Sequence, residues 1–158
     1  MNDCVGTDNL VATSSSYATD QNGLASDAIQ LGNIGYATAP SDIYFSSALT
    51  ITLWTKASSC VGGSGSWCRL LDFGSGTGVY NVFLSLKGSN GGLKFVMYDE
   101  SNNPYVNLET SYVLSTSWAF VAVTYDGYTA TFYVNGASIG SSTSSTLWVP
   151  PSFTRTLS

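Results

Sequence analysis

Carboxylate and amide side chains gather in one short stretch whose chemistry is that of a hard-cation site. Asp99, Glu100 and Asn102 stand almost side by side, with Ser101 and Asn103 completing the cluster. Ca²⁺ takes about six to eight oxygen ligands, and closely spaced carboxylate and amide oxygens can supply several of them. We therefore take Asp99, Glu100 and Asn102 as candidate calcium ligands, and Ca²⁺ is the one cofactor that the sequence suggests. The alternative is an ordinary connecting turn, because Asn-Asn-Pro is also a common turn sequence.

The chain lacks the residues that most catalytic mechanisms require. It contains no histidine, which removes Ser-His-Asp and Cys-His arrangements. Glycoside hydrolysis needs two carboxylates that face one substrate, but neighbours such as Asp99 and Glu100 point to opposite faces of a strand. Asp72 lies in an apolar run, and we expect it to stand at a strand end and bind a turn amide. We assign no catalytic residue and predict that the protein is not an enzyme.

Aromatic side chains offer a second kind of binding chemistry. The chain has 10 Tyr and 4 Trp, and rings in loops can stack on sugar rings. The aromatic residues in or near predicted loops, and hence the candidate ligand-binding residues, are Trp67, Tyr105, Tyr112 and Trp148. Alternatively, such rings close the edge of a core or anchor a protein partner. Trp54 and Trp118 lie within predicted strands, so we expect them to be in the core or half-buried.

Three cysteines bear on the cellular compartment. Cys60 and Cys68 enclose a Gly- and Ser-rich loop that is flexible enough to bring their Cβ atoms together, so we predict a Cys60–Cys68 disulfide. Closing so short a loop contributes about 2–3 kcal/mol on the chain-entropy estimate. The alternative is a pair of reduced thiols, while metal binding is disfavoured because histidine and a CxxC pair are both absent. Cys4 would be left to pair with another chain. An oxidising, extracellular or cell-surface location fits this pattern best.

Composition and charge exclude several classes of function. The chain has 158 residues, which suits one domain. Only five residues are Lys or Arg and the net charge is −5, so no basic surface is available to neutralise phosphates and we expect no nucleic-acid partner. No stretch approaches the roughly 18 apolar residues of a membrane helix. The expected partners are a glycan or an extracellular protein.

Short apolar runs, separated by Gly, Ser, Asn, Asp or Pro, recur along the chain without a helical period, which is typical of a β-sandwich or barrel. Thr50–Lys56 shows the clearest period of two, with Ile51 and Leu53 on one face. Strands are predicted at residues 28–31, 50–56, 69–73, 80–86, 93–98, 105–108, 118–125 and 128–134.

Turn residues stand between these runs. Asp126-Gly127 predicts a hairpin with a type I′ turn, because both residues tolerate positive φ. Asn135-Gly136 predicts the next turn, and Gly32-Asn33 predicts an earlier one. Residues 141–145 are read as a soft polar stretch. Residues 147–151 are read as an edge or an extended arm, because proline cannot donate to a ladder.

Two runs of the sequence carry a family resemblance: RLLDFGSGTG at residues 69–78 and WAFVAVTYDGYTATFYVNG at residues 118–136, preceded by AIQLGN and LTITLWTKA. With these runs, the chain resembles the laminin-G-like jelly-roll domains of the concanavalin-A-like lectin/glucanase superfamily. The resemblance covers residues 24–140. It implies an all-β, two-sheet antiparallel jelly-roll sandwich over residues 24–158, with residues 1–23 packing on it or extending from it. Family members commonly sit in secreted proteins, and their rim loops often hold Ca²⁺. The closely spaced acids that the glucanase members carry on one strand are not found here.

The resemblance therefore implies an extracellular, non-catalytic binding or adhesion module for a glycan or a protein. One departure suggests an alternative. Family domains usually continue past the VNG turn with further strands, whereas here Arg155 to Ser158 ends the sequence. We expect a sandwich that lacks its last strands or is completed by another chain. Since an open sheet edge is a template for pairing, the alternative function is a structural subunit of a surface layer or filament, assembled through that edge or through Cys4.

Overall fold

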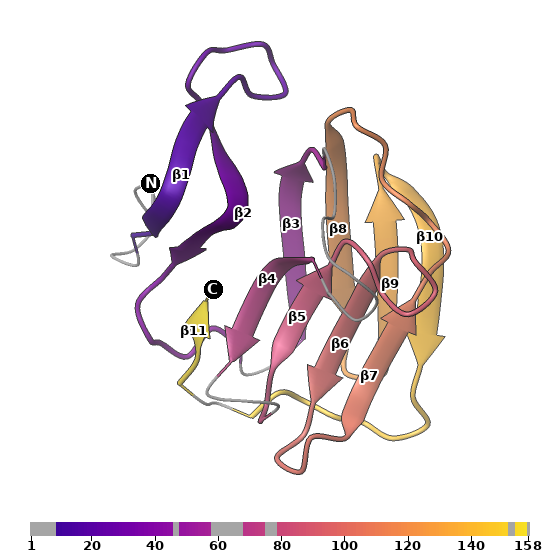
Figure 1. Ribbon diagram of the computed structural model, residues 1–158. Helices are drawn as coiled ribbons and strands as arrows, with labels where there is room; N and C mark the ends of the chain where they lie inside the picture. The colour runs from indigo at the N-terminus through magenta and orange to yellow at the C-terminus, as the bar shows by residue number, and fades with distance from the viewer. Residues whose placement is uncertain (1–8, 46–47, 58–67, 75–78, 152–153, 158) are drawn as a thin grey trace.

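The structure is a computed structural model, shown as a ribbon in Figure 1. It describes residues 9–45, 48–57, 68–74, 79–151 and 154–157, without the side chains of residues 32–34 and 156. All regular structure in these ranges is β-strand. The described part of the chain contains no helix long and apolar enough to cross a membrane.

Two sheets lie face to face (Figure 1). One sheet has four strands in the order β10 (Ala137–Thr143), β9 (Thr129–Val134), β8 (Ala119–Tyr125) and β3 (Leu49–Thr55). The other has five strands in the order β11 (Thr156–Leu157), β4 (Arg69–Gly74), β5 (Val82–Ser85), β6 (Lys94–Tyr98) and β7 (Pro104–Glu109). All neighbouring strands are antiparallel. The two-sheet antiparallel sandwich predicted from the sequence is confirmed.

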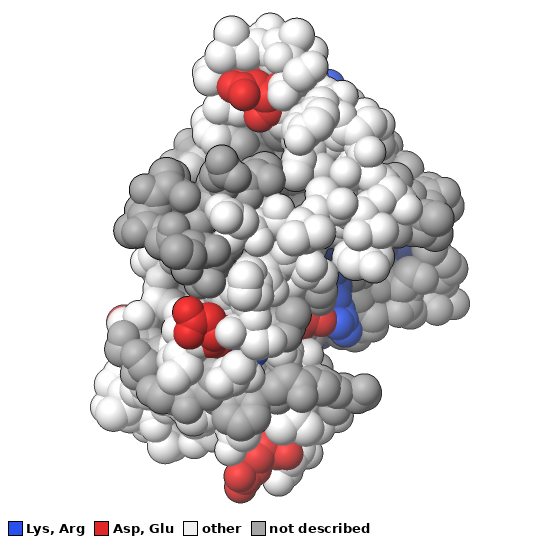
Figure 2. All heavy atoms as spheres, turned by 90° about the vertical axis from the view of Figure 1, so that its left-hand side faces the viewer, with Lys and Arg blue, Asp and Glu red and all other residues white. Residues whose placement is uncertain are grey.

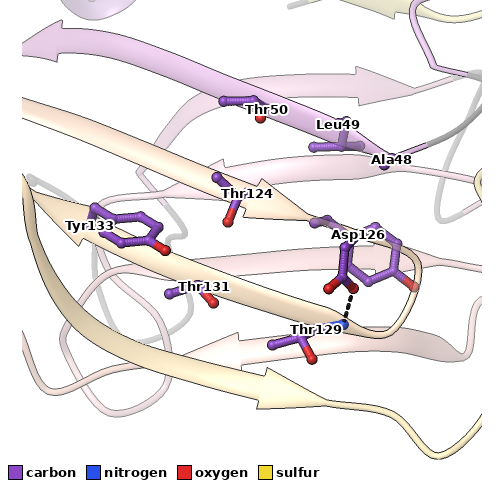
Figure 3. Close-up of a pocket in the computed structure, with 9 residues that line it drawn as sticks. Ala48, Leu49, Thr50, Thr124, Asp126, Thr129, Thr131 and Tyr133 are labelled. Carbon is purple, nitrogen blue, oxygen red and sulfur yellow. Dashed lines mark hydrogen bonds between the residues drawn. The ribbon is translucent and has the colours of Figure 1, made fainter.

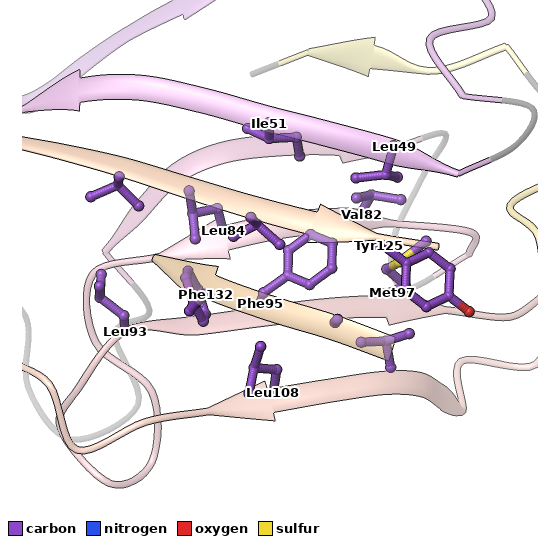
Figure 4. Packing of buried hydrophobic residues seen from close by; sticks show 14 of the residues in the cluster. Leu49, Ile51, Val82, Leu84, Leu93, Phe95, Met97, Leu108, Tyr125 and Phe132 are labelled. Atoms are coloured by element: carbon purple, nitrogen blue, oxygen red, sulfur yellow. The ribbon is translucent and has the colours of Figure 1, made fainter. Parts of the chain in front are cut away.

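The core lies between the sheets and follows from strand alternation. In β8 every second side chain is buried, and in β9 the same alternation is shifted by one residue. Phe132 of β9 meets Phe95 of β6 edge-on, with ring centroids 6.5 Å apart. Each such buried side chain stabilises the fold by about 1.5–3 kcal/mol. Figure 4 shows this packing, whose labelled members are Leu49, Ile51, Val82, Leu84, Leu93, Phe95, Met97, Leu108, Tyr125 and Phe132.

The two tight hairpins of the four-stranded sheet differ in turn type. The Asn135-Gly136 turn has positive φ at both residues, 51° and 82°, as a type I′ turn requires. The β8–β9 hairpin is also confirmed, but its predicted type I′ turn is wrong, because only Gly127 has a positive φ. The connection spans residues 126–128. The Asp126 carboxylate holds it by accepting hydrogen bonds from the backbone N–H groups of Tyr128 and Thr129.

A separate hairpin precedes the sandwich. β1 (Val11–Ala18) pairs with β2 (Ala28–Thr38), and Figure 1 shows this two-stranded sheet standing beside the other two. The predicted turn at Gly32-Asn33 is wrong, because β2 continues through it with an irregular register. The segment boundary expected at residue 23 falls within the β1–β2 connection. A two-stranded hairpin contributes little stability by itself in water, so β1 adds little to the sandwich.

The last described residues close one edge of the five-stranded sheet. Leu157 of β11 pairs with Phe73 of β4. The preceding Arg155 is fully buried, and its guanidinium donates to the carbonyl oxygens of Tyr80 at 3.0 Å and Pro151 at 3.2 Å. Burial lowers the pKa of Arg155. In the four-stranded sheet, by contrast, no described strand pairs with the outer edge of β3 or β10.

Candidate functional site

The outer face of the four-stranded sheet is lined by hydroxyl and aromatic side chains. These are the alternate residues of each strand that do not enter the core, and the described members carry no charge. They are Thr50, Thr52 and Trp54 of β3, Phe120, Ala122 and Thr124 of β8, Thr129, Thr131 and Tyr133 of β9, and Ser138, Ser141 and Thr143 of β10. Such a face offers many hydrogen-bonding groups together with flat apolar rings.

Strand register sets the hydroxyls in rows across this face. Thr50 lies opposite Thr124, Thr124 opposite Thr131, and Thr131 opposite Ser141. Neighbouring strands are about 4.8 Å apart, so this row is roughly 14 Å long. Because a hydroxyl both donates and accepts hydrogen bonds, the row can match a ligand that is itself rich in hydroxyl groups.

An open groove of about 460 Å³ lies along this row and includes Thr50, Thr124 and Thr131 in its lining. Figure 3 shows side chains from β3, β8 and β9 around it; the groove is lined by Ala48, Leu49, Thr50, Thr124, Tyr125, Asp126, Thr129, Thr131 and Tyr133. Its volume falls within the range of roughly 300–1,000 Å³ that small-molecule sites occupy. The groove therefore combines hydroxyls, the two aromatic residues Tyr125 and Tyr133, and the carboxylate of Asp126.

Asp126 supplies the carboxylate at the margin of the groove. Its Oδ1 accepts hydrogen bonds from the backbone N–H groups of Thr129 at 2.7 Å and Tyr128 at 2.8 Å. These two bonds, that of Thr129 first, lower the pKa of the Asp126 carboxyl, so the group is ionised at neutral pH. Both hydrogen bonds end on Oδ1, and Oδ2 is the oxygen that can accept a hydrogen bond from a hydroxyl group of a ligand.

Tyr125 fixes the turn that holds Asp126. The single hydrogen of its hydroxyl is shared between the carbonyl oxygens of Gly127 at 2.8 Å and Trp148 at 2.7 Å, which joins the β8–β9 turn to the loop after β10. Burial, followed by the nearby Asp126 and Tyr105 groups, raises the pKa of Tyr125 to about 12. The hydroxyl thus stays protonated, as a donor, at neutral pH.

The structure brings together two of the four predicted ligand-binding aromatics. Tyr105 on β7 and Trp148 stack with ring centroids 4.9 Å apart and planes 21° apart, and both are half-buried. Tyr112 follows the opposite end of β7 and is 40% exposed. Trp67 lies outside the described residues. Because Tyr105 and Trp148 each cover a face of the other, they present less ring surface to a ligand than their loop positions suggest.

Trp54 was predicted to be in the core or half-buried, and the first of these positions is wrong. Its side chain is 47% exposed and lies on the outer face of the sheet. Its ring packs against Phe120, with centroids 5.4 Å apart and planes 56° apart. The period-two pattern already contained the signal, since Trp54 shares the parity of Thr50 and Thr52.

The candidate calcium ligands form a turn between β6 and β7. Asp99 accepts hydrogen bonds from the backbone N–H groups of Ser101 and Asn103 at 2.8 Å each. The hydrogen bond from the Asn103 backbone lowers the pKa of Asp99 most. Glu100 accepts the Tyr80 hydroxyl at 2.9 Å, and Asn102 has a φ of 61°. The described residues contain no group of three or more Asp, Glu, His or Cys side chains that could hold a metal. Calcium binding stays a prediction.

A second set of charged groups lies on the outer face of the five-stranded sheet. Asp72 is buried and accepts hydrogen bonds from the Arg69 guanidinium and, at 3.1 Å, from the Asn81 amide. Lys94 is also buried, with its Nζ 3.2 Å from the Glu109 carboxylate. These charges are matched within the protein, so they stabilise the sheet and leave little capacity for a ligand.

The predicted disulfide lies at the border of the described chain. Cys68, which precedes β4, is disulfide-bonded. Its predicted partner Cys60 lies outside the described residues, and so does Cys4. The Cys60–Cys68 pairing therefore stays a prediction.

Comparison with known proteins places this sandwich in a family. The family model for the concanavalin A-like lectin/glucanases superfamily, Laminin_G_3, matches residues 31–157, so the chain belongs to that superfamily. Among solved structures, domain 4 of AbnA, a GH43 extracellular arabinanase from Geobacillus stearothermophilus in complex with arabinotriose, has the same fold. The TM-score is 0.77 at 17% identity, over 99% of this chain and 75% of that chain. No curated protein matches the chain.

Proposed function

We propose that the protein is an extracellular, non-catalytic module that binds a neutral glycan in the groove of the four-stranded sheet. The observation that carries this proposal is the convergence of the hydroxyls of Thr50, Thr124 and Thr131, the Tyr133 ring and the Asp126 carboxylate around one open groove. Sugars present hydroxyl groups and apolar ring faces, and this set of side chains meets both requirements.

The charge of the groove favours a neutral ligand over an acidic one. Among the described residues of its lining, Asp126 is the one that carries a charge. Along β3 the first cation is Lys56, six residues beyond Thr50 and hence roughly 20 Å away. A carboxylated or sulfated sugar would meet the ionised Asp126 with no cation to balance it, and the like charges would weaken binding.

The arrangement of carboxylates supports binding over hydrolysis. Glycosidases place two carboxyl groups roughly 5–9.5 Å apart. On the five-stranded sheet, Asp72 of β4 and Glu109 of β7 are separated by three strand spacings, roughly 14 Å. In the described lining of the groove, Asp126 is the single carboxylate. The AbnA domain is in complex with arabinotriose and belongs to an extracellular arabinanase. This supports both an oligosaccharide ligand and an extracellular location for the present protein.

A glycan array followed by isothermal titration calorimetry tests this function. Neutral glycans should bind, and acidic analogues should bind more weakly. Tyr133→Ala should weaken affinity about tenfold and Thr131→Val about threefold to tenfold, because one ring contact or one hydrogen bond is lost. Tyr17→Ala, on the separate β1–β2 hairpin, is the matched tyrosine control and should change nothing. If Tyr105→Ala abolishes binding while Tyr133→Ala has no effect, the stacked pair is the site and the groove is not.

Self-association is a second candidate function, favoured by the β1–β2 hairpin. Tyr17 and Val11 are 69% and 65% exposed, and neither strand carries a charged residue or a proline. Edge strands are usually protected from pairing by charged side chains or proline. Figure 2 views the molecule from this side, and most of its described atoms belong to uncharged residues. A filament or surface-layer subunit would use this hairpin, the open edge of β3 or Cys4.

Sedimentation velocity over a concentration series, with and without reductant, tests the second candidate. A reversible oligomer that Tyr17→Asp disperses would support pairing through the hairpin. Dispersal by reductant alone would assign the association to a cysteine. A monomer at every concentration would end this candidate and leave glycan binding in place.

A further inference from the structure

An exposed tryptophan stands on the same sheet face as the groove. Trp54 is 47% exposed, although its neighbours Ile51 and Leu49 on the other face of β3 are buried. A large ring left in water forgoes the stabilisation that burial would give it. Phe120 packs against the ring and is itself fixed by Asn135, which accepts the Phe120 N–H at 2.9 Å and donates its own N–H to the Phe120 carbonyl at 2.8 Å.

The ring is in line with the groove. Trp54 lies four residues along β3 from Thr50, and Phe120 lies four residues along β8 from Thr124, a separation of roughly 13 Å in each case. Both pairs face each other across the same two strands, so the direction from the groove to the aromatic pair is the strand direction. A ligand that lies along β3 and β8 would reach both.

No large side chain of β8 interrupts this path. Ala122, whose side chain is a single methyl group, lies between the two ends, opposite Thr52 on one side and Tyr133 on the other. The small Ala122 side chain thus has the aromatic residues Tyr133 and Phe120 as neighbours on this face. On the far side of β3 no described strand pairs with it, so no described strand borders the path along its β3 side.

We propose that the groove and the Trp54–Phe120 pair form one elongated track that takes several consecutive sugar residues of a neutral polysaccharide. The inference rests on the proposed function and specifies its ligand as a chain of several sugars and not as a single sugar. Asp126 and the threonines bind hydroxyls at one end of the track. Trp54 stacks on a sugar ring at the other end, and the ligand crosses Ala122 between them.

Titration with neutral oligosaccharides of increasing length tests the track. The probes are arabinose oligosaccharides from the disaccharide upward, together with the same length series of the neutral glycan that binds best on the array. Affinity for the intact protein should rise about tenfold or more once the ligand is long enough to reach Trp54. Trp54→Ala should lose that gain and leave the affinity for the disaccharide unchanged. Trp54→Phe should keep part of it.

Two further variants separate the track from the groove. Ala122→Leu should weaken the longer oligosaccharides about tenfold and spare the disaccharide, because it fills the path while leaving Asp126 and Trp54 in place. Thr131→Val should weaken every length. Circular dichroism and the thermal midpoint establish that each variant is folded, and Tyr17→Ala again serves as the control.

The outcomes distinguish this inference from the function on which it rests. If Thr131→Val weakens binding while Trp54→Ala leaves all lengths unchanged, the groove binds glycan but the track is wrong. If no neutral glycan binds the intact protein at any length, both proposals are overturned. If Trp54→Ala disrupts a protein complex and leaves the oligosaccharides unaffected, Trp54 belongs to a protein interface and the track is again wrong.

Discussion

Removing one oxygen atom tests whether the β8–β9 turn is held as the structure indicates. Tyr125→Phe keeps the ring in the core and deletes the hydroxyl that donates to the carbonyls of Gly127 and Trp148. Tyr125 is only 2% exposed, so water cannot easily replace the lost donor. The Gly127 carbonyl keeps the Trp148 N–H at 3.0 Å, so the loss falls on the Trp148 carbonyl, and leaving one such acceptor without its donor costs about 1–3 kcal/mol.

The expected loss is measurable by guanidinium denaturation and by calorimetry. For a domain of this size, each kcal/mol shifts the midpoint by roughly 2–4 °C, so a loss near the middle of the range lowers Tm by about 4–8 °C. Affinity for glycan should also fall, because the turn that carries Asp126 is less firmly held. Tyr128→Phe is the matched control, since Tyr128 is exposed and its ring stands on the same turn.

Alkaline pH gives an independent check of the same hydroxyl. The folded-state pKa of Tyr125 is raised from 10.0 to about 12. For a group that is neutral below its pKa, the associated stability is fully present below pH 10 and is lost as pH rises towards 12. The stability difference between the parent protein and Tyr125→Phe should therefore narrow between pH 10 and 12. A difference below about 0.5 kcal/mol at neutral pH, equal to that of Tyr128→Phe, would refute the reasoning.

The remaining predictions concern the edge of the five-stranded sheet, the β6–β7 turn and the cysteines. Arg155→Ala should lower the free energy of unfolding by about 3 kcal/mol, because it leaves a cavity and two carbonyls without their donor; a loss below about 1 kcal/mol in guanidinium would contradict the buried geometry. Asp99→Asn should reduce stability at neutral pH, and the difference from the parent protein should vanish in acid. A carboxyl whose pKa is lowered on folding contributes stability above its unfolded-state pKa, and this stability is lost as pH falls through the folded-state pKa. Thermal melts from pH 7 downward measure this, and if the turn binds Ca²⁺, the same melts with added Ca²⁺ should show a raised midpoint that Asp99→Asn lacks. Peptide mapping without reductant should recover a Cys60–Cys68 crosslink, and recovery of Cys68 joined to Cys4 would overturn that pairing.

The sequence predicts the fold well where apolar residues alternate. β8 and β9 are predicted directly as strands because apolar residues recur at every second position, as Val121 and Val123 do in β8 and Phe132 and Val134 do in β9. β1 and β10 were not predicted as strands, since their Ser- and Thr-rich sequences lack apolar alternation and both stand at sheet edges. Composition near Asp126-Gly127 predicts a turn there, but the carboxylate that bonds the following amides, and not the type I′ geometry, decides its shape.

The candidate site was less accessible to sequence analysis, because it depends on pairing between distant segments. Thr50 and Thr124 become neighbours only when β3 pairs with β8, and no local pattern specifies that register. The aromatics chosen for their loop positions include Tyr105 and Trp148, which the fold stacks against each other. The exposed ring on the sheet face, Trp54, was available from parity alone. Alternation is thus a better guide to exposed aromatics than position in a loop.

Strand β8 shows why function and stability should be separable in this protein. Val121 and Val123 enter the core, whereas Ala122 and Thr124 form the floor of the outer face. Because these sets alternate along one strand, a substitution on the outer face leaves the packing beneath it unchanged. Variants of the proposed glycan-binding face should therefore lose affinity for glycan with little change in thermal midpoint. A core variant such as Val123→Ala should instead lower the thermal midpoint more than it changes the affinity. Outer-face variants that unfold the protein before they weaken binding would show that this face is part of the fold's support and not a ligand surface.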